Sequence, residues 1–557
     1  MALNNKRLIS TLFAASLLSG AALLAAPWFT DRAAAAENER TLQSNYDPLA
    51  LAHKTEGPLE HREAGIPAQC YTKSEGTSNP CWVCHTDSHY PNSMTDFRLQ
   101  AEYAFSDEGQ QNHWTNLFVD RRPVMAEMSD AYVLSYIRGD NYTRLRTLMG
   151  EKKDFPGYAP DLDFNAGFDE LGFAKDGSAW RAFRYKPFPG TFWPTNGSTD
   201  DVLIRLGKKF RQKGGVDMLA VYRANLALLE VSISSDPSVS DDQLHVQIEP
   251  IDETLIAFDL NKDGKLETNI TELIGLPGHF MGDAQDERLW RALYPTDTEF
   301  LHSVRYIDPD EPSMIGKRMK ELRYMKKFRS LEPSQLMGLY EHEHDEKDAG
   351  RLPVVQGSAE SGLRNKFGWY LQSYIEDGVG RLRLQTHQEQ QACMGCHSNL
   401  GVTIDQTFSF ARKVPGTDGW RYQDLRTLPD VPQLGHDKPE FLTYLERVGG
   451  GDEFRENQEL LDRFFPGGKL DEASVRRAAP GGDQDFAWLV LPTRERALDL
   501  NRAYIALTRE QRFERGRDAV LKPAERVLRA VENESTGLED KGRVYRDGQL
   551  RLDWPRQ

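Results

Sequence analysis

The sequence predicts a mainly α-helical, multi-domain protein with long ordered loops and only minor β structure. The chain has 557 residues, enough for roughly two to four domains. Apolar residues recur at helical spacing in 129–150 and 216–230, and charged helical segments dominate the sequence after about residue 435. Residues 151–200 are instead rich in Gly, Pro, Asp and aromatic residues, so we expect ordered loops there.

The helices expected near the C-terminus span 453–464 and 494–529, and the second should break near Pro523, because proline cannot continue a helix. Short strands are expected at 255–258 and after Lys265. A basic helix is expected at 314–329. It could pair with acidic groups of a cofactor, dock an acidic partner or form a solvated face, and its cations are Arg318, Lys320, Arg323, Lys326 and Lys327.

Composition narrows the class of protein. Hydrophobic residues make up 39% of the chain and charged residues 28%, as in ordinary globular proteins. The formal net charge is -16 and no long basic run occurs, which argues against a nucleic-acid partner.

The first 36 residues resemble a secretory signal. A short basic stretch at 5–7 precedes an apolar run at 8–26, and Ala33–Ala36 offers the small residues that signal peptidase prefers. We expect cleavage and export to the periplasm, with an uncleaved anchor as the alternative. No cysteine lies near the run, which argues against a lipid anchor, and no later stretch is long enough to span a bilayer, so we expect no stable membrane insertion after cleavage.

Four of the five cysteines lie in two Cys-x-x-Cys-His motifs. These are Cys81, Cys84 and His85, and Cys393, Cys396 and His397. In such a motif two thiols can add to the vinyl groups of haem, and the next residue, His, then falls beneath the iron. A Cys-x-x-Cys pair without haem would be a redox or zinc site.

At these motifs the chain resembles c-type cytochromes. The resemblance implies two covalent haem c groups, attached at the four cysteines and ligated on the proximal side by His85 and His397. The motifs lie about 310 residues apart and share little else, so we do not expect a tandem of small class I cytochrome domains.

The distal ligands of these haems would decide the function. His113 is the leading candidate at the first site, with Met and upstream His residues as alternatives. No Met follows Met394, so the second site would use His387, His436, His342 or His344, Lys413, or no ligand.

Two further features invite interpretation. Cys70 is either a buried inert thiol or a thiolate near a haem, as in some dihaem enzymes of sulfur metabolism. Asp259, Asn261 and Asp263 resemble the first half of an EF-hand calcium loop, and the alternative is a turn held by Asx hydrogen bonds.

These features divide the chain into six predicted regions. They are a signal peptide (1–36), an N-terminal arm (37–66), a first haem region (67–150), a middle region with the possible calcium loop (151–360), a second haem region (361–435) and a charged helical region (436–557).

The sequence thus predicts a periplasmic dihaem cytochrome that passes electrons between redox partner proteins. The alternative is a dihaem oxidoreductase, peroxidase-like or sulfur-oxidising, with one catalytic haem. A haem-based sensor or scaffold is a third class. No residue pattern indicates the substrate or the oligomeric state.

Overall fold

The computed structural model describes residues 46–54, 66–73, 83–84, 90–91, 108–349, 351, 355–433, 436–449, 455 and 457–531. Its centre is an eight-stranded antiparallel sheet with the path β1-β2-β7-β8-β11-β10-β9, and β12 pairs with β11. The strands are β1 (Arg181–Phe183), β2 (Thr199–Arg205), β7 (Glu299–Ile307), β8 (Ile315–Lys327), β9 (Gln356–Ser358), β10 (Gly362–Arg364), β11 (Trp369–Glu376) and β12 (Leu382–Leu384).

The four central strands are registered so that one row of side chains crosses the sheet. Val202 pairs with His302, His302 with Arg323, and Arg323 with Ser373. Because side chains two apart along a strand share a face, Phe300, Met325 and Leu371 form the next row on the same side.

A β-bulge interrupts the pairing of β7 with β8. Val304 pairs with Glu321 and the next residue, Arg305, pairs with Met319, which leaves Lys320 as the extra residue. A bulge turns the side chain of the extra residue out of the regular alternation. This places Lys320 on the same cavity as Glu321 and Arg323.

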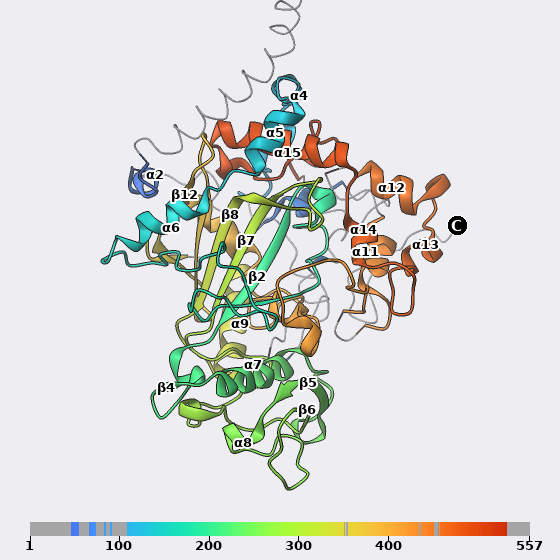
Figure 1. The fold of residues 1–557 in the computed structure, drawn as a ribbon. Helices are drawn as coiled ribbons and strands as arrows, with labels where there is room; N and C mark the ends of the chain where they lie inside the picture. Colours follow the sequence, from blue (N-terminus) through green and yellow to red (C-terminus); the bar gives the residue numbers. More distant parts are fainter. Residues whose placement is uncertain are drawn as a thin grey trace, which may run out of the picture.

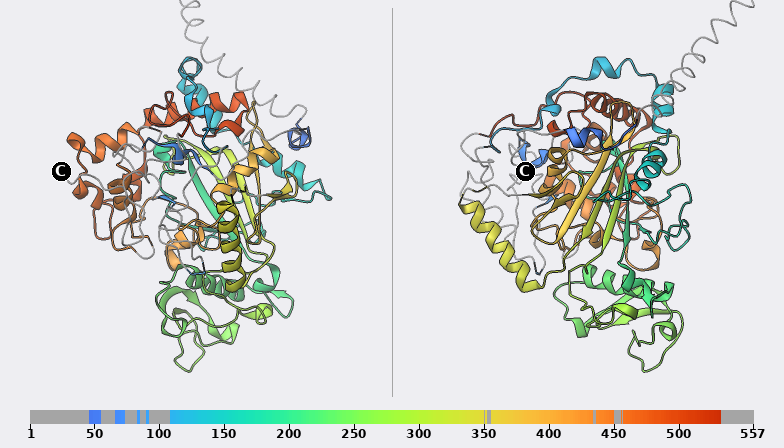
Figure 2. Two further views of the ribbon diagram at one scale, coloured as in Figure 1. Left: turned by 180° about the vertical axis from the view of Figure 1, so that it is seen from behind. Right: turned by 90° about the vertical axis from the view of Figure 1, so that its left-hand side faces the viewer.

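Helices lie at the ends of the sheet and on both sides of it (Figure 1). At one end lie α4, α5 and α15, and α11 to α14 pack together beside the sheet. Figure 2 shows α9 at the periphery, while the long strands run through the middle of the molecule. These helices are α4 (Arg122–Met125), α5 (Asp130–Ile137), α9 (Pro333–Asp348), α11 (Glu440–Val448), α12 (Gln458–Phe464), α13 (Glu472–Arg476), α14 (Phe486–Val490) and α15 (Arg494–Glu510). The remaining helices beside the sheet are α2 (Ala50–Lys54), α6 (Tyr142–Gly150) and α10 (His387–Gln391).

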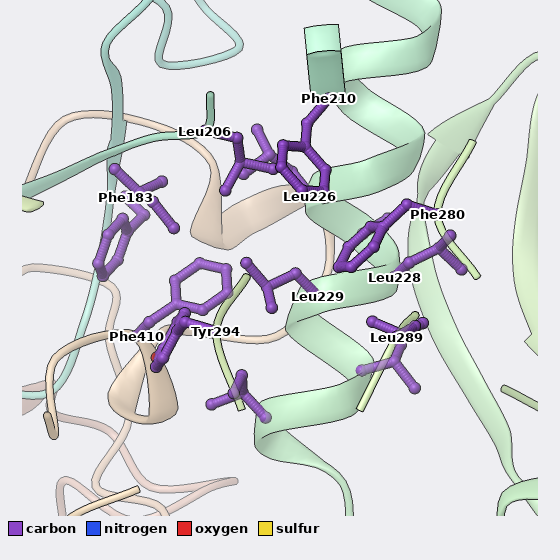
Figure 3. Packing of buried hydrophobic residues seen from close by; sticks show 14 of the residues in the cluster. Phe183, Leu206, Phe210, Leu226, Leu228, Leu229, Phe280, Leu289, Tyr294 and Phe410 are labelled. Carbon is purple, nitrogen blue, oxygen red and sulfur yellow. The ribbon is translucent and has the colours of Figure 1, made fainter. Parts of the chain in front are cut away.

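A lobe at the opposite end is built on one buried helix. It contains α7 (Leu219–Ser234), α8 (Glu253–Ile256), the pair β5 (His245–Ile251) and β6 (Ile270–Ile274), and the hairpin β3 (Gln212–Lys213) with β4 (Val216–Asp217). In Figure 3, Leu229 of α7 points toward Tyr294 and Phe410 from the body of the protein. All three residues belong to one apolar core, so this core joins the lobe to the sheet.

The fold class predicted from the sequence is wrong, because the protein combines helices with a large antiparallel sheet. The clearest error is 314–329, which forms β8 and not a basic helix. Its cations suggested a solvated surface, yet Arg318, Lys320 and Lys327 are buried and hydrogen-bonded to partners inside the protein. Residues 255–258, expected as a strand, lie partly in α8.

Several helices are confirmed. Residues 129–150 contain α5 and α6, 216–230 falls largely within α7, and the two helices expected near the C-terminus correspond to α12 and α15. The second of these ends at Glu510, well before Pro523, and Gln511 caps it in the left-handed conformation. The predicted domain boundaries stay predictions. Within the described residues, no helix is long and apolar enough to cross a bilayer.

Candidate functional site

One face of the central sheet forms the floor of a cavity of about 240 Å³. The floor consists of the two rows described above, with Val304 and Glu321 beyond them. Its size is close to the lower end of small-molecule sites, which hold roughly 300–1,000 Å³. Segments far apart in the sequence close the cavity, and they contribute Trp114, Phe188, Phe192, Phe408, Tyr504 and Arg517.

Both Cys-x-x-Cys-His motifs reach this cavity. Cys84 lines it from the first motif, and Cys393, Cys396 and His397 line it from the second. The backbone links the two regions, because Val402 N donates to the carbonyl oxygen of Cys84 at 3.2 Å. Cys81 and His85 lie outside the described residues.

Burial holds Cys396 and His397 of the second motif neutral. Burial raises the pKa of the Cys396 thiol to about 11 and lowers the pKa of His397 to about 4. The ring of His397 stacks on Phe408, and its Nδ1 lies 2.9 Å from the carbonyl oxygen of Gln406. At neutral pH these groups therefore add polar surface but little charge to the cavity.

Most of the charge on the wall comes from arginines. Glu321 Oε2 accepts hydrogen bonds from Arg323 Nε at 2.9 Å and Arg517 Nη1 at 3.2 Å. Burial by itself would raise the pKa of Glu321. The neighbouring Arg323 is the main group that opposes this effect, and the pKa is lowered to about 2. On another part of the wall Arg455 pairs with Asp518 at 2.6 Å.

Cations outnumber carboxylates among the lining residues. Arg323, Arg455 and Arg517 face only Glu321 and Asp518, and Lys320 adds a further basic group. His302 also lines the cavity, and its Nε2 lies 2.9 Å from Asp200 Oδ2. The excess positive charge favours an anionic occupant.

Three buried hydrogen-bond donors on the cavity wall have no acceptor within the described part of the chain. They are Asn196 Nδ2, Tyr504 Oη and Arg517 Nε. Asn196 is 6% exposed and Tyr504 only 3%. An unsatisfied buried donor costs about 1–3 kcal/mol, so such groups are usually paired in a protein's working state.

The candidate distal ligands do not meet at this cavity. His113 Nε2 lies 3.1 Å from the carbonyl oxygen of Glu108. His387 begins α10, and Gln391 Nε2 lies 3.4 Å from its Nδ1. His436 is half-buried in the segment before α11. None of the three is among the residues that line the cavity within the described chain.

The possible calcium loop is a turn closed by its own backbone. Gly264 N donates to Asp259 Oδ2 at 2.8 Å, Asp263 N to Asn261 Oδ1 at 3.1 Å, and Lys265 N to Asp263 Oδ1 at 2.8 Å. Each of these bonds uses one side-chain oxygen, so the segment forms the turn held by Asx hydrogen bonds that was the alternative prediction.

Sequence reasoning missed His302, Tyr504 and Arg517. His302 could have been found from the alternation Phe300, His302, Val304, in which every second residue faces one side of a strand. The other two come from α15 and the segment after it, and no local pattern in the sequence places them at the cavity.

The fold and the cavity define an α+β protein built around a cavity lined by basic residues. Residues 58–480 match a family model described as a "-like lipoprotein", and the chain belongs to this lipoprotein family. It is similar to an "Uncharacterized lipoprotein" of Aquifex aeolicus (strain VF5), with 31% identity over 552 residues that cover 87% of this chain and 91% of the relative. No solved structure matches the chain.

The family match corrects the functional prediction. The matched range contains both Cys-x-x-Cys-His motifs, yet it matches lipoproteins and not cytochromes, so the prediction of a dihaem cytochrome or oxidoreductase is wrong. The predicted haem c groups and calcium are corrected with it. Within the described residues, no three His, Cys, Asp or Glu side chains form a group that could hold a metal ion.

Membership of a lipoprotein family agrees with the export signal at 1–36, so the protein is an exported one. The first cysteine of the sequence is Cys70, which lies far beyond the apolar run at 8–26. The absence of a nucleic-acid partner and the role of partner proteins stay predictions.

Proposed function

We propose that this protein is a periplasmic binding protein whose cavity holds a small organic anion with an apolar body. One observation carries the proposal: three buried atoms on the wall lack partners in the described chain, and all three can donate a hydrogen bond. Asn196 Nδ2 and Arg517 Nε can only donate, so a ligand that satisfies them must offer acceptors. Each satisfied donor recovers about 1–3 kcal/mol that the empty site forgoes.

The charge of the wall supports an anion in particular. Arg323 presents its guanidinium beside His302 and Ser373 in one row of the sheet. Its side chain is 28% exposed, so part of it stays open to the cavity after the pairing with Glu321. An arginine fork matches the geometry of a carboxylate, sulfonate or phosphate group.

The remaining wall suits an apolar body. Phe300, Met325 and Leu371 form one row of the floor, and Phe188 and Phe408 stack on each other at 4.5 Å between ring centroids. Ligand sites of this kind combine an apolar lining with a few placed polar groups, which fix the orientation of the ligand.

A pair of fluorescent probes tests the proposal. The anionic probe is 8-anilinonaphthalene-1-sulfonate, and its neutral counterpart is N-phenyl-1-naphthylamine, which has the same aromatic body without the sulfonate. We expect the wild-type protein to bind the anionic probe more tightly. Arg323→Gln should weaken that binding about 10- to 100-fold, because a hydrogen bond to a charged group contributes about 1.5–3 kcal/mol.

Arg421→Gln is the matched control, because Arg421 is half-exposed, pairs with Asp418 and does not line the cavity. It should leave both affinities unchanged. Equal affinity of the wild-type protein for the two probes, or equal loss in both variants, would contradict the proposal.

A further inference from the structure

Lys320 occupies an unusual position on the cavity wall. It is the extra residue of the bulge between β7 and β8, and it is only 1% exposed. Its Nζ donates to the carbonyl oxygen of Gly197 and to Ser198 Oγ, the latter at 3.0 Å. Both acceptors are neutral, and no carboxylate of the described chain lies within ion-pair distance of Nζ.

Aromatic rings enclose the same ammonium group. Nζ lies 4.2 Å from the ring centroid of Tyr504 and 4.9 Å from that of Tyr306. Cation–π contacts stabilise a buried ammonium only partly. Such a contact contributes about 2 kcal/mol at a desolvated site, which is less than the cost of removing the charge from water. Lys320 is therefore a buried basic group whose charge, when it is protonated, no carboxylate of the described chain balances at ion-pair distance.

Charged and titratable groups lie on each of the elements that pack against Lys320. Among the charged groups, Glu376 on β11 has the largest effect on Lys320. It accepts hydrogen bonds from the hydroxyls of Tyr136 at 2.7 Å and Tyr306 at 2.5 Å and lies 3.5 Å from Arg318 Nη1. The other groups facing this region are Glu321 and Arg323 on β8, His302 on β7 with Asp200 on β2, Tyr504 on α15 and Arg517 after α15.

We propose that Lys320 takes up one proton from solvent when the anion binds, so that the cavity is a proton-coupled anion site. The inference rests on the proposed function and adds its regulation. In the empty site the neutral amine avoids the cost of a buried, unpaired charge. A bound anion supplies the missing counter-charge, and the amine becomes ammonium, which balances the charge brought by the ligand.

The electrostatics agree with this arrangement. Burial lowers the pKa of Lys320 to about 7, and Glu376 and Glu321 only partly oppose the shift. An anion nearby raises the pKa again. At pH values above 7 the empty site therefore holds a neutral amine, the loaded site holds an ammonium, and affinity falls as pH rises.

Calorimetric titration with 8-anilinonaphthalene-1-sulfonate tests the inference, because the sulfonate stays ionised throughout and any proton taken up goes to the protein. Measuring the binding enthalpy at each pH in two amine buffers that differ in their enthalpy of ionisation gives the number of protons taken up, and neither buffer adds an anion that could compete with the probe. We expect about one proton at pH 8.5, almost none at pH 5.5, and affinity that falls toward tenfold per pH unit above 7.

Lys320→Arg separates this residue from other titrating groups, because arginine keeps its charge at every pH of the experiment. The variant should bind the probe with no proton uptake and with an affinity independent of pH. Lys326→Arg, on the same strand but paired with Asp297 at 2.9 Å, should behave as the wild type.

The outcomes distinguish the two proposals. Binding by the wild type without proton uptake overturns the role of Lys320 and leaves the anion site intact, and it needs no variant to be measured. Equal proton uptake in Lys320→Arg also overturns it. Failure of the wild type to bind the sulfonate at any pH overturns the proposed function itself.

Discussion

At the scale of single residues, the wall of the cavity is organised around one carboxylate. Glu321 accepts from Arg323 and Arg517, which approach it from β8 and from the segment after α15. It thereby ties the floor of the cavity to its far wall. Removing one partner of such a buried group leaves the others uncompensated and costs about 3–5 kcal/mol.

The pH dependence of stability should reveal Glu321. Its pKa in the folded protein is about 2, below the ordinary value of 4.5, so it contributes stability that is fully present above pH 4.5. This contribution is lost as pH falls toward 2. We expect Glu321→Gln to lower the free energy of unfolding at pH 7 by about 3 kcal/mol, measured by urea titration. Between pH 5 and pH 3 the variant should lose less stability than the wild type.

Glu311→Gln is the control for this measurement, because Glu311 is exposed and no interaction of its side chain ties it to the cavity in the described chain. Parallel stability profiles for Glu321→Gln and the wild type would show that Glu321 is not the group that responds.

Glu376 should act in the opposite direction. Burial raises its pKa to about 7 despite Arg318 and two tyrosine hydroxyls. A folded-state pKa above the unfolded value gives stability that is fully present below about pH 4.5 and is lost as pH rises through 7. Between pH 5 and pH 8, urea unfolding of Glu376→Gln should therefore show a smaller decline in stability than the wild type. A decline as large as that of the wild type would assign the effect to another group, such as Asp430, whose pKa is also raised to about 7.

At the scale of elements, the helices were easier to predict than the strands. The periodic apolar positions of α7 and the charged pattern of α15 are visible in the sequence. β8 is not, because both faces of the sheet are covered and nearly every residue from Arg318 to Lys327 is at least half-buried. A strand that is buried on both sides does not alternate apolar with polar residues in its sequence. A buried ion pair such as Lys327 with Asp405 cannot then be distinguished from surface charge in the sequence.

The first turn of α15 provides a test at this scale, since this helix carries Tyr504 to the cavity. Thr493 is its N-cap and accepts from Arg496 N at 3.2 Å. Thr493→Ala should lower the free energy of unfolding by about 1 kcal/mol, and Thr493→Ser, which keeps the hydroxyl, should cost a few tenths. Equal losses of unfolding free energy in the two variants would show that the methyl group of Thr493, and not its capping hydroxyl, stabilises the protein.

At the scale of the whole molecule, the cavity exists because distant segments converge on one sheet face. The two motifs lie about 310 residues apart, yet Cys84 and Cys396 line the same space. The sequence singled out the second motif and Cys84 as site residues, and it did so for a cofactor that the family match does not support. It could not indicate Tyr504 or Arg517, because their roles depend on packing between elements that only the fold brings together.

The apolar core that joins the α7 lobe to the sheet should contribute strongly to the free energy of unfolding. Leu229 is fully buried in the core that also contains Tyr294 and Phe410 (Figure 3). Leu229→Ala should cost about 2–5 kcal/mol by leaving a cavity. Leu219→Ala on the same helix should cost little, because Leu219 is 54% exposed. Similar melting temperatures for the two variants would contradict the packing described here.

The most direct test of the anion site is to locate a bound anion. Crystals of the protein soaked with 6-bromo-2-naphthoate would reveal the bromine by its anomalous signal. The account predicts bromine density inside the cavity, over the row of Phe300, Met325 and Leu371, with the carboxylate within hydrogen-bond distance of Arg323, Tyr504 or Arg517. Bromine density only on the outer surface, or a carboxylate in the cavity that contacts none of these donors, would contradict it.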